Sequence, residues 1–133
     1  IIRSLPKKHQ CIKVYEFLNR MDFAYAAADM IISRAGAGTI AELCAVGKPT
    51  ILVPSPNVAE DHQTKNAKAL VERKATFLIT DSDAEKKLVK AALNLIIDTQ
   101  KGTDLGQNMT KMTLLDADEV IANEILKIAN EWS

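Results

Sequence analysis

The chain has 133 residues, which suits one domain, and its 47% hydrophobic content is enough to bury a core. Seventeen Lys and Arg residues balance seventeen Asp and Glu residues, so the charge excludes a general polyanion binder and we expect no nucleic-acid partner. No apolar run reaches the about 20 residues that a membrane span needs, and the first ten residues lack the layout of a signal peptide.

Cysteine and histidine are both scarce. Cys11 and Cys44 lie in no CxxC or Cys/His spacing, which predicts reduced, structural thiols in a cytosolic chain. With only two histidines, neither a zinc site nor a Ser/His/Asp triad is predicted. We therefore predict no metal site, no cofactor and no catalytic residue in this chain.

Short apolar runs alternate with longer segments of helical period. The runs are rich in β-branched and aromatic residues and predict strands at 11–18, 30–33, 50–54 and 76–80. Helical periodicity lies between them, at 20–29, 38–46 and 60–74. This alternation predicts an α/β fold, a Rossmann-like parallel sheet of three or four strands with flanking helices.

Two further helices are predicted after the last strand. The first, 82–98, opens with a Ser82/Glu85 capping box. Its apolar face is predicted to comprise Leu88, Ala91, Ala92, Leu95 and Ile96. The second, 116–132, has Asp116 as its predicted N-cap. The polar segment 98–108 is predicted to be a break between them.

A loop of small residues follows the second predicted strand, in "SRAGAGTIAEL". We expect residues 34–37 to form the turn and the helix to begin at Gly38 or Thr39. Small residues let a ligand approach the backbone, and the unpaired N–H groups of a first helical turn attract phosphate. The loop is not a Walker or GxGxxG motif, so an anion seat and a tight turn without a ligand both remain open.

Polar residues near this loop have the same two interpretations. Ile40, Leu43, Cys44 and Gly47 share a helix face that should pack on the sheet, so Glu42 points away from it. Glu42 is then either a solvated first-turn carboxylate favoured by the helix dipole or an acceptor for two ribose hydroxyls.

A second polar group follows the next predicted strand. Pro54 and Pro56 force a loop, which places His62, Gln63 and Asn66 near the start of a helix at the carboxyl end of the sheet. Ligands of open α/β folds bind at that end. The side chains of His62 and Gln63 are either ligand contacts or merely exposed first-turn residues.

Three motifs occur in a fixed order, RAGAxTxAE, GxPxxLVP and HQxxNA. A fourth segment, "LLDADEVIANEIL", lies near the end of the chain. Through these four segments, residues 12–130 resemble the carboxyl-terminal domain of the MurG family. That family comprises bacterial inverting GT-B glycosyltransferases that transfer N-acetylglucosamine from UDP-N-acetylglucosamine to lipid I, forming lipid II in peptidoglycan synthesis. The resemblance implies that this donor domain binds UDP-N-acetylglucosamine and that a separate amino-terminal domain supplies the acceptor site and the proposed base.

The resemblance also implies a role for individual residues. Glu42 matches the carboxylate that holds the ribose, Gln63 the glutamine that reads the sugar with His62 beside it, and Leu18 a position whose backbone reads the uracil. Ala35 stands where some members have serine, which removes one hydroxyl contact. The complete expected substrate-binding set is Leu18, Ala37, Gly38, Thr39, Ile40, Ala41, Glu42, His62 and Gln63.

The resemblance leaves part of the family's donor domain without a counterpart. Only eleven residues precede residue 12, where the family has a strand, a GGS-type loop and a second βα unit. In the sheet order 3-2-1-4-5-6 the strand 12–18 would be third and would lack its neighbours. Either residues 1–133 are a partial donor domain from a longer protein, which we favour and expect to be inactive alone, or this strand pairs abnormally.

The resemblance further implies peripheral association with the cytoplasmic face of the bacterial plasma membrane. Two other functions stay open: a stand-alone donor-binding subunit of a two-subunit transferase, and a related UDP-sugar transferase with another acceptor.

Overall fold

The sheet of this chain has three short parallel strands, and the computed structural model describes residues 11–56 and 61–113. The strands are β1 (Ile31–Ser33), β2 (Thr50–Leu52) and β3 (Phe77–Leu78), in the order β1-β2-β3. In the register, Ile31 lies opposite Thr50 and Ile51 opposite Phe77. The predicted α/β class is confirmed, with strands shorter than the apolar runs suggested.

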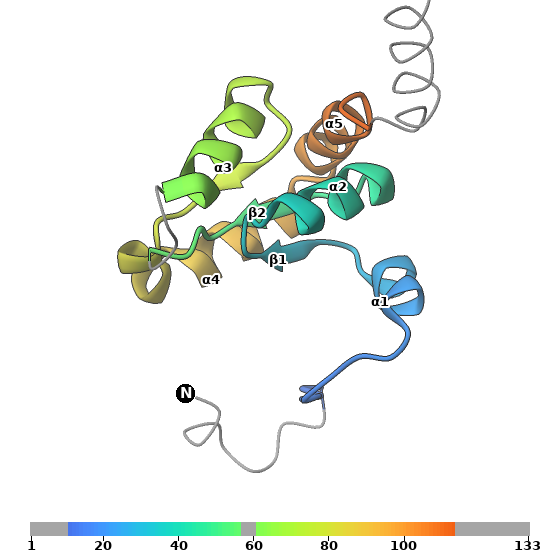
Figure 1. The fold of residues 1–133 in the computed structure, drawn as a ribbon. Helices are drawn as coiled ribbons and strands as arrows, with labels where there is room; N and C mark the ends of the chain where they lie inside the picture. The colour runs from blue at the N-terminus through green and yellow to red at the C-terminus, as the bar shows by residue number, and fades with distance from the viewer. Residues whose placement is uncertain (1–10, 57–60, 114–133) are drawn as a thin grey trace, which may run out of the picture.

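Helices cover both faces of this sheet (Figure 1). They are α1 (Met21–Ala27), α2 (Ala37–Val46), α3 (His62–Glu72), α4 (Asp81–Ile97) and α5 (Thr99–Thr110). Since successive strand residues point to opposite faces, Ile51 and Leu52 enter two different clusters. Leu52 packs with buried residues of α2, α3 and α5, and Ile51 packs with residues of α4 and α5.

The predicted polar break at 98–108 is wrong, because this segment forms α5. The Asp98 side chain caps α5 by accepting a hydrogen bond from the Lys101 N–H at 3.1 Å. The buried face of α5 comprises Gly102, Leu105, Gly106 and Met109, the i, i+3, i+4, i+7 pattern of one helix face. Two of these four residues are glycines, which carry no apolar side chain. The sequence of α5 therefore shows only a weak pattern of apolar residues, although the helix packs closely against α2.

The predicted strand 11–18 is also wrong. Residues 11–20 lie outside every helix and strand and all are exposed, with Phe17 77% exposed and Ile12 51%. In Figure 1 the segment before α1 runs away from the sheet. A strand requires a hydrogen-bonded neighbour, and among the described residues none lies beside this segment. An apolar, β-branched sequence could not by itself supply one.

Helix α4 differs from its prediction at its start and near its end. It begins at Asp81 with Thr80 as N-cap and no side-chain cap, so Ser82 lies inside the helix and the Ser82/Glu85 capping box is wrong. On the predicted apolar face Leu95 is buried, but Ile96 is 54% exposed. The predicted helix 116–132 lies outside the described residues.

Candidate functional site

The amino terminus of α2 follows β1 directly and presents free backbone donors. Gly36 is the N-cap, with φ −65° and ψ 146°, and the helix begins at Ala37, earlier than the predicted Gly38 or Thr39. The first intrahelical bond runs from the Ile40 N–H to the Gly36 carbonyl at 2.9 Å, which leaves the N–H groups of Ala37, Gly38 and Thr39 without helical partners.

Little side-chain bulk covers these donors. Ala37 and Gly38 are exposed, and a Cβ built on Gly38 would meet no atom within 4 Å. Ile40 instead packs against the core, so only its backbone remains for a ligand, while Ala41 is exposed. Three free N–H groups at the positive end of a helix, in open space, suit an anion such as a diphosphate.

Glu42 points away from the core face, as predicted, while Leu43 and Cys44 are buried. The first turn of α2 contains no acidic residue, so Glu42 is not the first-turn carboxylate of the alternative interpretation. Its Oε2 accepts a hydrogen bond from the Tyr25 hydroxyl at 2.9 Å. Burial, and then this bond, raise the pKa of the Tyr25 phenol, so the hydroxyl remains a donor. Tyr25 therefore orients Glu42 and leaves Oε1 available to a ligand.

Gln63 lies in the first turn of α3, beside the loops that follow β1 and β2. Its Oε1 accepts hydrogen bonds from the Ala35 N–H at 3.3 Å and the Ser55 N–H at 2.9 Å. His62, the first residue of α3, is exposed. Gln63 thus contacts the small-residue loop, which sequence spacing did not reveal.

Arg34 connects the carboxyl ends of all three strands. Its Nη1 donates to the carbonyls of Val53 and Pro54, both at 3.2 Å, and forms an ion pair with Asp81 at the start of α4. The pair is half exposed, so it adds little stability by itself, but it ties the end of β1 to the two following strand ends.

The structure brings most of the predicted site residues to one end of the sheet. The first turns of α2 and α3 both lie beyond the carboxyl ends of the strands, where Gln63 joins their loops. Leu18 differs, because it lies in the irregular segment before α1 and is 38% exposed. The structure does not bring Leu18 to a strand end, and its role at the uracil stays a prediction.

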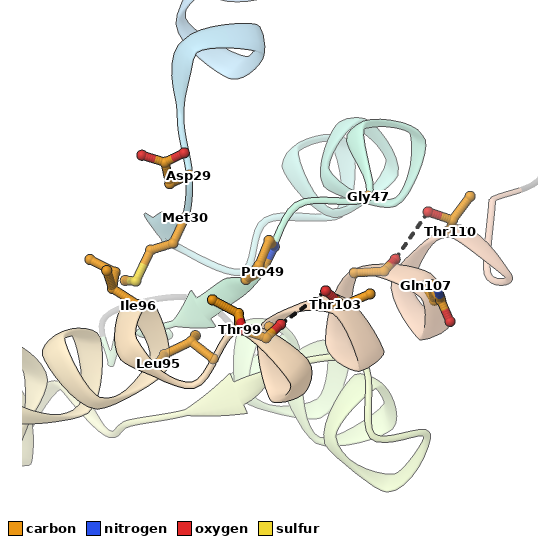
Figure 2. Close-up of a pocket in the computed structure, with 12 residues that line it drawn as sticks. Asp29, Met30, Gly47, Pro49, Leu95, Ile96, Thr99, Thr103, Gln107 and Thr110 are labelled. Atoms are coloured by element: carbon orange, nitrogen blue, oxygen red, sulfur yellow. Dashed lines mark hydrogen bonds between the residues drawn. The ribbon is translucent and has the colours of Figure 1, made fainter.

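A cleft of about 540 Å³ lies at the opposite end of the sheet (Figure 2). Met30 and Pro49, which precede β1 and β2, line it together with α5. Figure 2 shows that the Thr103 and Thr110 hydroxyls on α5 donate back to the carbonyls of Thr99 and Gly106. These hydroxyls are used within the helix, and the cleft is separate from the candidate site.

Sequence reasoning missed Tyr25, Arg34 and Asp81 as members of the site. A tyrosine in a short helix and an arginine before small residues carry no distinctive pattern, and their partners lie 17 to 47 residues away. Within 11–56 and 61–113, no group of three or more His, Cys, Asp or Glu side chains could hold a metal ion.

Comparison with known proteins shows which family this chain belongs to. Residues 2–125 match the glycosyltransferase family 28 C-terminal domain. The chain belongs to that family. It is 53% identical over 116 residues to a protein of Bacteroides thetaiotaomicron named UDP-N-acetylglucosamine--N-acetylmuramyl-(pentapeptide) pyrophosphoryl-undecaprenol N-acetylglucosamine transferase, covering 87% of this chain and 31% of that protein.

Further matches of this family 28 domain agree with the first. A Porphyromonas gingivalis protein of the same name is 48% identical over 128 residues, covering 95% of this chain and 34% of that protein. The crystal structure of Acinetobacter baumannii MurG matches with a TM-score of 0.75 and 30% identity, over 86% of this chain and 33% of that chain. The chain thus spans about a third of the length of the relatives it matches, and the predicted resemblance to the carboxyl-terminal domain of the MurG family is confirmed.

Proposed function

We propose that this chain is the donor-binding part of an inverting glycosyltransferase that transfers N-acetylglucosamine from UDP-N-acetylglucosamine to lipid I. The relatives' shared name supports this substrate pair. The observation that carries the proposal is the uncapped start of α2, whose free N–H groups lie beside Gln63 and one helical turn before Glu42.

Each part of the site has a role in this reaction. The N–H groups of Ala37, Gly38 and Thr39 bind the diphosphate, while Glu42, oriented by Tyr25, accepts hydrogen bonds from the ribose hydroxyls. When the acceptor hydroxyl attacks C1 of the sugar, negative charge grows on the leaving UDP. The positive end of α2 stabilises that charge, which is electrostatic catalysis. We infer that the acceptor site and the general base lie in the part of such an enzyme that this chain does not match.

The acceptor determines where the reaction takes place. The relatives' name describes an undecaprenol-linked acceptor, and such a lipid resides in a membrane. We therefore propose peripheral association with the cytoplasmic face of the bacterial plasma membrane. No helix in the described part of the chain is long and apolar enough to cross a membrane. The relatives carry this domain within one longer chain, which favours the single-chain enzyme over a separate donor subunit.

A chimera tests the proposal: this chain replaces the matching third of the Bacteroides thetaiotaomicron relative. Transfer of labelled N-acetylglucosamine to a lipid I analogue is measured, with the parent enzyme as reference. We expect transfer by the chimera and loss of transfer when Glu42→Ala is introduced. A chimera that melts as cooperatively as the parent but binds no UDP-N-acetylglucosamine would contradict the proposal.

A further inference from the structure

The motif HQTKNA contacts the motif RAGAG through the backbone of one residue, Ala35. Gln63 Oε1 accepts from the Ala35 N–H, and Asn66 Nδ2, one turn later on α3, donates to the Ala35 carbonyl at 3.5 Å. Both polar groups of Ala35 are therefore held by α3. The Ala35 side chain is fully buried in the core cluster, so core packing fixes its side chain while α3 fixes its backbone.

The orientation of the Gln63 amide follows from its partners. The Ala35 and Ser55 groups are both N–H donors, so the atom between them must be the carbonyl oxygen. Oε1 consequently joins the loop after β1 to the loop after β2. No residue in the described part of the chain accepts a hydrogen bond from the Gln63 Nε2 group, which leaves this group as a donor for a ligand oxygen.

We propose that Gln63 and Asn66 are positioning residues that set the shape of the diphosphate loop through the backbone of Ala35. The inference rests on the proposed function and adds a role distinct from contact with the sugar. Gly36 and the free N–H groups of α2 follow Ala35 immediately, so a shift of Ala35 displaces the donors that bind the diphosphate. Preorganised donors of this kind lose affinity when their support is removed.

The two roles of Gln63 predict different ligand dependence. If Gln63 only contacts the sugar, its loss leaves UDP affinity unchanged and weakens UDP-N-acetylglucosamine alone. If its Oε1 also positions the loop, UDP affinity falls as well, whereas uridine, which lacks the diphosphate, binds as before. Asn66 provides a second test of the loop's positioning, because its side chain donates to the Ala35 carbonyl.

The experiment uses the chimera described above, with the variants Gln63→Met, Asn66→Leu and the double variant. Affinities for uridine, UDP and UDP-N-acetylglucosamine are measured as inhibition constants or by titration, together with the melting temperature. Lys68→Met, an exposed position on the same helix, is the matched control. If Gln63→Met or Asn66→Leu lowers the melting temperature, the smaller variants Gln63→Ala and Asn66→Ala are used instead.

We expect Gln63→Met, which removes both hydrogen bonds to Oε1, to raise the Kd for UDP about fivefold or more. Asn66→Leu removes one hydrogen bond and should raise it about threefold. The double variant should lose less than the product of the two, because both side chains hold the same residue. Uridine affinity should stay within twofold of the unaltered chimera.

Two results would overturn the positioning role while leaving the proposed function intact. One is unchanged UDP affinity with weaker binding of UDP-N-acetylglucosamine, which makes Gln63 a sugar contact only. The other is an equal fall in uridine and UDP affinity with a lower melting temperature, which makes both residues general supports of the fold. Failure of the proposed function differs from either, since the unaltered chimera would then bind no UDP.

Discussion

Gly106→Ala tests the close packing of α5 against the end of α2. A Cβ at Gly106 would lie 2.3 Å from the Gly47 carbonyl oxygen and 3.3 Å from the Gly47 carbonyl carbon. These are backbone atoms of a constrained residue: Gly47 ends α2 in the left-handed region at φ 65°, with its N–H bonded to the Leu43 carbonyl at 2.9 Å. The new methyl group can be accommodated only if α5 moves away from α2.

The opposing energies can be compared. Replacing glycine by alanine inside a helix gains about 1 kcal/mol, whereas overpacking of a core typically costs about 1 to 3 kcal/mol. Contact with backbone atoms places Gly106 at the upper end of that cost, so we expect a net loss of about 1 to 2 kcal/mol in the free energy of unfolding.

Equilibrium urea unfolding followed by circular dichroism measures this loss. Gly38→Ala is the matched control, because a Cβ there meets no atom within 4 Å and the fold should not be destabilised. Unchanged m-values would show that the midpoint shift reports stability. If Gly106→Ala were as stable as Gly38→Ala, the contact between α5 and Gly47 would not exist and the reasoning would be refuted.

Three further predictions concern the site and the core. Glu42→Ala should weaken UDP binding by about 2 to 3 kcal/mol. Tyr25→Phe should weaken it by about 1 kcal/mol, because it loosens the carboxylate without removing it. Unchanged UDP affinity of Tyr25→Phe in a calorimetric titration would deny Tyr25 a positioning role. Gly36→Val should fold, since φ is −65° and the nearest atom to a new Cβ is Thr39 Oγ1 at 3.7 Å. It should abolish UDP binding, because the new side chain keeps the diphosphate from the backbone. Normal UDP binding would indicate a turn that holds no ligand. Cys44 is buried, and this burial raises the pKa of its thiol. A disulfide reagent should therefore modify the exposed Cys11 quickly and Cys44 only on unfolding. Fast modification of both thiols would contradict the core packing.

The candidate site was largely accessible from sequence because its main parts are local. A short strand, small residues and a helix start lie within ten positions, and helical periodicity alone turns Glu42 away from the Leu43 and Cys44 face. The joint motifs then pointed to the family that the comparisons confirmed. The hydrogen bonds of Tyr25 and Gln63 could not be predicted in the same way, because each joins elements whose relative placement depends on the packed sheet.

Sequence by itself determined the order of strands and helices from β1 to α4 and the exposed position of Glu42, since both follow from the periods of the helix and the strand. Tertiary structure decided the outcome wherever a partner was required. The apolar segment 11–18 is not a strand because no described strand pairs with it. The polar, glycine-containing segment 98–108 is helical because Gly102 and Gly106 let α5 pack directly against Pro49 and Gly47. Local propensity therefore decided neither segment. Residues 98–108 became helical because long-range contacts support the helix, and residues 11–18 formed no strand because such contacts are lacking.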